Sequence, residues 1–172
     1  MKFKLLFLSI LLIPFFIKAQ TKNSNRKLKQ VIEDFRTSII EHNDVEKFGD
    51  LFLHDSVTWS AIFTNKTKKM ALKSMPDFTF HSTNYKTFYE NLKDRTEEKF
   101  YNVEIIERSE FATISFDYTL SINSKIQNWG TEYWSLILIN DTWKITSVTW
   151  TMNNEEIEKS PFSHETPFRL TP

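Results

Sequence analysis

The chain has 172 residues, with 22 basic and 22 acidic side chains, 16 Phe, five Trp, five Tyr and no cysteine. Because there is no basic surplus, the electrostatic basis for nucleic-acid binding is missing, and the lack of cysteine excludes disulfides, thiol nucleophiles and cysteine-ligated metals. The two glycines, Gly49 and Gly130, do not form a glycine-rich phosphate loop, which excludes P-loop and Rossmann nucleotide sites.

The first twenty residues have the pattern of a secretory signal peptide. Lys2 and Lys4 precede an apolar run over residues 5–17, which is shorter than the roughly 20 residues needed to cross a bilayer. We expect cleavage near Ala19, no stable membrane anchor afterwards, and a periplasmic or secreted bacterial protein. The chain then divides into a signal peptide (1–19), one domain (20–153) and an extended C-terminal tail (154–172).

Two helices and a strand are predicted at the start of the domain. Residues 28–40 carry apolar side chains at spacings of three and four, which indicates an amphipathic helix. Asn43 interrupts this pattern, and Asp44 can cap a second, short helix that ends near Phe52. Alternating apolar residues over 57–63 predict the first strand.

The next segment combines a lysine-rich stretch with a third helix. Residues 65–74 are rich in lysine and precede Pro76, so we expect an exposed loop or a broken hairpin there. Residues 82–84 offer capping side chains for a helix that carries Tyr85, Phe88, Tyr89 and Leu92 on one face.

From Glu98 onward the apolar pattern has a period of two, which predicts a four-stranded antiparallel meander. The first strand has residues 101, 103 and 105 on one face, and turns at 123–124 and 140–141 separate the later strands. The strand over 125–139 is apolar on both faces, which predicts that both are covered. We therefore predict an α+β cone, with three N-terminal helices packed on a strongly curved mixed or antiparallel sheet that ends in the meander.

This order of elements resembles the nuclear transport factor 2-like (NTF2-like) superfamily, especially its SnoaL-like and DUF4440-type bacterial branch. The resemblance covers about residues 28–153 and includes FLHDSVTW at 52–59, Asn84-Tyr85, WGTEYW at 129–134 and WKITSVTW at 143–150. It implies a cone-shaped domain, often homodimeric through its sheet. In the superfamily the pocket serves isomerases, dehydratases, cyclases, epoxide hydrolases and binding proteins.

Two residues are candidates for acid or base catalysis. Glu132 is predicted on the same strand face as Trp134, where a carboxylate must be paired or have a raised pKa, unless it reaches solvent at the start of the strand. His54 could act as an acid or base, or simply end a helix. The first helix lacks the tyrosine that the ketosteroid isomerase pattern requires, and Asp117 is expected on the solvated sheet face.

Seven aromatic residues are candidates for ligand binding: Trp59, Phe63, Phe88, Tyr118, Tyr133, Trp134 and Trp150. We expect them to line a pocket for a small apolar or amphipathic molecule. One alternative is an isomerase-like or dehydratase-like enzyme in which Tyr118 or Tyr133 donates a hydrogen bond. Another is a filled cone whose sheet face, with Trp129 or Trp134 turned outward, forms a homodimer. The four histidines show no metal-ligand spacing, so we expect no metal and no cofactor.

Overall fold

The computed structural model describes the backbone of residues 13–78 and 80–170, and side chains within these ranges from residue 25 onward. The first twelve residues of the predicted signal peptide lie outside this part. The elements follow in the order α1 (Ile13–Glu41), α2 (Val45–Gly49), β1 (Thr58–Phe63), α3 (Asn65–Ser74), β2 (His81–Thr83), α4 (Tyr85–Glu90), β3 (Thr96–Arg108), β4 (Phe111–Ile122), β5 (Lys125–Ile139), β6 (Thr142–Asn154) and a short 3-10 helix, η1 (Pro161–His164).

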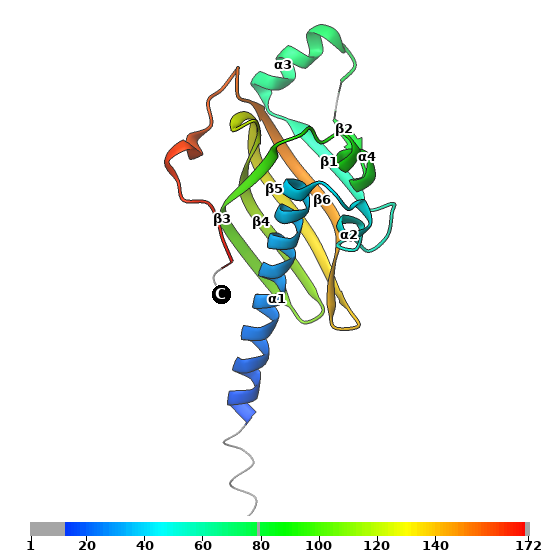
Figure 1. The fold of residues 1–172 in the computed structure, drawn as a ribbon, viewed down its shortest axis with the longest axis vertical. Coiled ribbons are helices and arrows are strands. Elements are labelled where there is room, and N and C mark those ends of the chain that lie inside the picture. Colours follow the sequence, from blue (N-terminus) through cyan, green and yellow to red (C-terminus); the bar gives the residue numbers. More distant parts are fainter. Residues whose placement is uncertain (1–12, 79, 171–172) are drawn as a thin grey trace, which may run out of the picture.

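The six strands of the described chain form one mixed sheet in the order β2-β1-β6-β5-β4-β3. β1 runs parallel to β6, and the other neighbouring pairs are antiparallel. Figure 1 shows the sheet curving around α1, which crosses one of its faces. The predicted α+β class and the four-stranded meander are confirmed, although four helices rather than three precede the meander.

Local signals correctly predicted the starts of α2 and α4 and two turns of the meander. Asp44 caps α2 by accepting a hydrogen bond from the Lys47 N–H at 2.9 Å, and Asn84 caps α4 in the same way. The residue pairs at 123–124 and 140–141 have φ between 48° and 64°, the left-handed conformation that tight hairpin turns require. The last two connections of the meander are therefore the turns that the sequence predicts.

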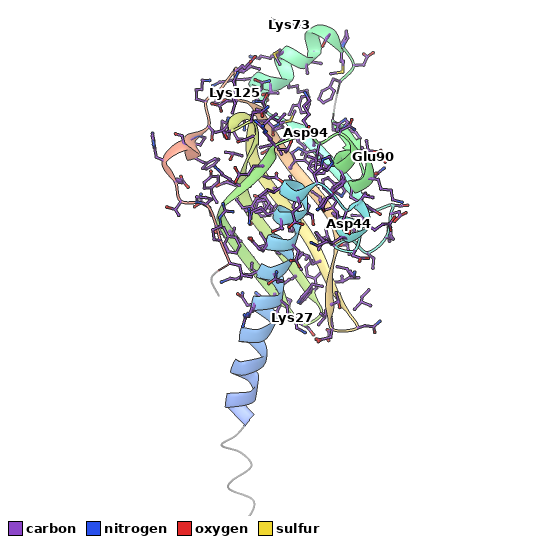
Figure 2. All side chains as sticks on the ribbon, in the orientation of Figure 1. Lys27, Asp44, Lys73, Glu90, Asp94 and Lys125 are labelled. Carbon is purple, nitrogen blue, oxygen red and sulfur yellow. The ribbon has the colours of Figure 1, made fainter. Side chains whose placement is uncertain are left out.

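Helix α1 buries the apolar stripe that the sequence predicts. Four of its side chains are at most 1% exposed: Leu28, Ile32, Phe35 and Ile39. Lys27 lies where the helix leaves the sheet (Figure 2), and it pairs at 2.5 Å with Asp141 in the turn between β5 and β6. The preceding part of α1 extends beyond the sheet (Figure 1). None of the helices in the described ranges is long and apolar enough to cross a membrane.

The prediction of an exposed loop at residues 65–74 was wrong, because this segment forms helix α3. Its buried side chains, Thr67 and Ala71, are four residues apart and therefore lie on one helical face. The Thr67 hydroxyl accepts a hydrogen bond from the Asn154 N–H at 3.0 Å, which fastens α3 to the end of β6. Lysine is a good helix former, and Lys73 lies near the outer end of α3 (Figure 2).

A β-bulge in β3 changes which side chains face the helices. Asn102 has φ of 51°, and the pairing of β3 with β4 shifts just after Tyr101. Before the bulge, Glu98 and Phe100 face inward, whereas residues 103 and 105 do so after it. The prediction that residues 101, 103 and 105 share a face was therefore wrong. Tyr101 instead stacks on Phe162 of the tail, with ring centroids 5.2 Å apart.

The C-terminal tail packs against the sheet and is not extended throughout. η1 brings Phe162 against Trp129 as well as Tyr101, and the Trp129 indole N–H donates to a tail carbonyl at 2.8 Å. Further along, the Phe168 N–H donates to the Phe100 carbonyl of β3 at 2.7 Å. Figure 1 shows the tail running beside β3 at the edge of the sheet.

Candidate functional site

The concave face of the sheet and the helices surround a cavity of about 150 Å³. Aromatic side chains from α1, β1, α4 and β6 form much of its wall: Phe35, Trp59, Phe88 and Trp150. The meander adds Glu98, Tyr118, Leu120, Asn128, Glu132 and Met152. A cavity of this volume holds one benzene-sized ring. A larger, open hollow of about 400 Å³ between α1, β3 and the tail has no buried charged side chain in its wall.

Glu132 faces the interior from β5. It lies opposite Phe116 of β4 and Trp150 of β6, and it is 5% exposed. Its Oε1 accepts a hydrogen bond from the Trp134 indole N–H at 2.6 Å. Burial raises the pKa of Glu132 to about 7, although this hydrogen bond acts in the opposite direction. Of the two positions considered from the sequence, the structure places Glu132 inside the cone.

A second carboxyl group, which sequence reasoning missed, enters the cavity from β3. Glu98 is 3% exposed, and its Oε2 has no hydrogen-bond partner. Burial raises the pKa of Glu98 well above its ordinary value, and the nearby Glu132 carboxyl raises it further. The ion pairs within the described chain include neither acid. Among the described residues, the cavity wall therefore holds two acids and no basic side chain.

Tyr118 reaches the cavity between these acids, but its hydroxyl is already bonded. The hydroxyl donates to the Thr151 carbonyl of β6 at 3.1 Å. Burial raises the pKa of Tyr118 well above its usual value, so the phenol stays neutral. The backbones are close here, because a Cβ built at Gly130 would lie 2.0 Å from the Thr151 carbonyl oxygen. Only glycine therefore fits at position 130 while β5 and β6 keep this separation.

The predicted ligand-binding residues separate into three groups. Trp59, Phe88, Tyr118 and Trp150 lie in the cavity wall. Trp134 is buried beside the cavity and acts as the hydrogen-bond donor to Glu132. Phe63 packs instead against Phe78, with ring centroids 4.5 Å apart, and Tyr133 is 56% exposed on the opposite sheet face. Successive residues of a strand point to opposite faces, which separates Tyr133 from Trp134.

His54 does not join the cavity. It is exposed in the turn before β1, where its Nδ1 accepts a hydrogen bond from the Ser56 N–H at 3.1 Å. The adjacent Asp55 binds Lys86 and the Tyr85 hydroxyl of α4, and these two hydrogen bonds lower the pKa of Asp55. The segment therefore fastens α4 and offers no acid or base shielded from water.

The part of the chain that the structure describes does not bring together three His, Asp or Glu side chains that could hold a metal ion. The two cavity acids lack the third protein ligand that metal sites with an open position ordinarily have. The described cavity wall combines aromatic rings with two carboxyl groups and the Asn128 amide.

Comparisons with known proteins bear on the fold. No protein-family model and no curated protein sequence matches the chain. An NTF2-like protein with a cystatin-like fold from Novosphingobium aromaticivorans is similar in structure, with a TM-score of 0.57 and 10% identity over 87% of this chain and 92% of that chain. A proposed dehydratase of the NTF2-like family from Streptomyces avermitilis has a TM-score of 0.55 and 12% identity over 76% of this chain and 96% of that chain. This chain has the NTF2-like fold.

A protein of a different kind is also similar in structure to this chain. It is the beta subunit of a proposed aromatic-ring-hydroxylating dioxygenase from Novosphingobium aromaticivorans, with a TM-score of 0.55 and 12% identity over 79% of this chain and 92% of that chain. At such identities the likeness is one of fold alone. A shared fold hosts many functions, so the function of this domain has to be argued from its own site.

Proposed function

We propose that this NTF2-like domain binds a small apolar or amphipathic molecule in the aromatic cavity. The supporting observation is a cavity of about 150 Å³ with rings from five different elements in its wall. Close-packed interiors leave few voids larger than a water molecule, so a space of this size is unusual for a core alone. Rigid rings give a ligand apolar contact, and a few polar groups fix its orientation.

Titration calorimetry with benzene-sized compounds tests this proposal. We expect saturable binding that Leu120→Phe weakens, because the larger side chain would occupy part of the cavity. Tyr133→Phe on the opposite face serves as the matched control and should leave the affinity unchanged. Failure of every such compound to bind the folded protein would contradict the proposal.

Proton transfer of the isomerase or dehydratase kind is the second candidate function. It is favoured by Glu132, because a buried carboxyl with a pKa near the working pH can both take up and release a proton. Tyr118 bonds to the β6 backbone and Tyr133 lies on the opposite sheet face, so neither is positioned as the donor. For any compound that is turned over, Glu132→Gln should abolish turnover and leave affinity nearly intact. Unchanged turnover would exclude this role.

We also propose that the chain is exported to the periplasm or the medium. The signal pattern in the sequence supports this, and cleavage near Ala19 would shorten α1 only in the part that extends beyond the sheet (Figure 1). The buried stripe begins later, at Leu28. Mass spectrometry of the chain expressed in a bacterium with its own leader should find a product that begins near Gln20. A full-length product inside the cells would contradict export.

We further propose that the chain forms a homodimer through the outer face of the sheet. The second apolar face of β5 is uncovered in the single chain, where Tyr133 is 56% and Ile139 is 39% exposed. Trp129 and Trp134 pack within the chain, so the contact would instead use Tyr133. Tyr133→Asp should convert a dimer to a monomer in light scattering, and Met75→Asp on another surface should not. An unchanged dimer mass for Tyr133→Asp would contradict this interface.

A further inference from the structure

The cavity contains two carboxyl groups that binding of a purely apolar molecule does not explain. Both Glu98 and Glu132 are at most 5% exposed. Trp134 donates to one oxygen of Glu132, whereas Oε2 of Glu98 has no hydrogen-bond partner. Burying an acid without a partner costs folding free energy, so a hydrophobic core alone gives no reason to keep them.

The described chain supplies no positive charge to these acids. No Lys, Arg or His lies in the cavity wall, and the ion pairs of the described residues are elsewhere. The titratable groups in the wall are Glu98 from β3, Tyr118 from β4 and Glu132 from β5. The contributions of α1, α4, β1 and β6 are all uncharged. The cavity thus offers acceptors for a cation that the described residues do not provide.

The remaining wall is suited to the apolar part of such a cation. Trp59 lies at 4.9 Å from Phe88 and at 6.0 Å from Trp150, measured between ring centroids, and its ring is nearly perpendicular to that of Trp150. Aromatic faces attract organic cations as well as hydrocarbon, and the attraction increases where water is excluded. Rings and carboxyl groups together recognise a positive charge attached to an apolar body.

Building on the proposed pocket, we propose that its ligand is a small organic cation, a protonated amine with an apolar body about the size of one ring. The ammonium group binds the carboxylates of Glu98 and Glu132. The apolar body lies against Trp59, Phe88 and Trp150. The ligand thereby provides the positive charge that the cavity lacks.

Binding of a cation has a characteristic pH dependence. An ammonium group favours the ionised carboxyls, so binding releases protons, and affinity rises with pH until both acids are ionised in the free protein. A neutral ligand that accepts hydrogen bonds from protonated Glu98 and Glu132 would instead bind more weakly as the pH rises. Tyr118 stays neutral throughout and does not contribute to either trend.

Three compounds of nearly equal shape separate these cases: benzylamine, benzyl alcohol and benzoate, titrated calorimetrically near pH 5.5 and pH 8. We expect benzylamine to bind about tenfold or more tighter than benzyl alcohol at the higher pH, and benzoate to bind most weakly, because charge-assisted hydrogen bonds are the stronger ones. Benzylamine affinity should increase with pH. Repeating the titration in buffers with different ionisation enthalpies should detect the released protons.

Matched variants identify the carboxyls responsible. Glu98→Gln and Glu132→Gln should each weaken benzylamine about tenfold and change benzyl alcohol by less than about threefold. Glu104→Gln, an exposed position on the same strand as Glu98, should change neither. Circular dichroism tests whether each variant is folded. If a variant does not fold, the order of the three compounds and the pH dependence of the unaltered protein decide the question.

Two failures are distinguishable. Benzyl alcohol or benzoate binding as tightly as benzylamine, or benzylamine affinity that falls with rising pH, would overturn the cationic ligand and leave the pocket intact. Absence of binding by all three compounds would contradict the ligand-binding function itself.

Discussion

Replacing Glu132 with glutamine should remove much of the pH dependence of stability that this residue introduces. In the unfolded chain the carboxyl has its ordinary pKa of 4.5, whereas burial raises the pKa in the folded protein to about 7. The folded state therefore favours the protonated form. The contribution of Glu132 to stability is fully present below about pH 4.5 and is lost as the pH rises to about 7. The separation of these pKa values corresponds to about 3 kcal/mol of unfolding free energy.

Glutamine has no charge to bury, and its side-chain carbonyl can still accept the hydrogen bond from Trp134. The unfolding free energy of Glu132→Gln, measured relative to that of the unaltered protein, should therefore rise by about 3 kcal/mol when the pH is raised from about 4 to about 8. Urea unfolding, followed by tryptophan fluorescence and circular dichroism, measures this difference at each pH. Glu104→Gln, at an exposed position on β3, is the control. Its effect on the unfolding free energy should be the same at pH 4 and pH 8. An equal effect of Glu132→Gln at pH 4 and pH 8 would refute the argument.

Three further substitutions test packing and backbone conformation through urea unfolding. Gly130→Ala should lower the unfolding free energy by about 3 kcal/mol or more, because the added Cβ would lie 2.0 Å from the Thr151 carbonyl oxygen. A loss below about 1 kcal/mol would mean that β5 and β6 separate easily at this point. Ser124→Gly should add about 0.5 to 1 kcal/mol, since φ at Ser124 is 62°, and a loss of stability would contradict that turn conformation. Phe162→Ala should cost about 3 kcal/mol and speed proteolysis of the tail, whereas an unchanged cleavage rate would show that η1 does not hold it.

Sequence periodicity predicted most of the fold because most elements bury one large apolar face. The stripe of α1, the alternation in β4 and β5 and the polar turn pairs each indicate one structure without help from distant residues. α3 differs because its buried face consists of Thr67 and Ala71. Such small side chains do not produce a visible apolar stripe, and the surrounding lysines resemble a solvated loop.

The candidate site could be predicted only in part, and the reason lies in one residue of β3. Alternation along β5 is unbroken from Glu132 to Leu136, so the inward face of Glu132 follows from Trp134 beside it. In β3 the bulge at Asn102 shifts the alternation by one residue. Extending the pattern backward from residues 103 and 105 therefore assigns Glu98 to the wrong face. The signal that could have placed Glu98 on the inner face is its spacing of two residues from Phe100.

The tail contact with β3 affects how the molecule meets its neighbours. Edge strands with free backbone groups can pair with strands of other molecules, which is a common route to aggregation. At one edge of this sheet β2 has three residues, and at the other the Phe168 N–H already occupies the Phe100 carbonyl. For pairing with a strand of another molecule, the sheet therefore offers one very short edge and one partly covered edge. Self-association is left chiefly to side chains on the outer face of the sheet.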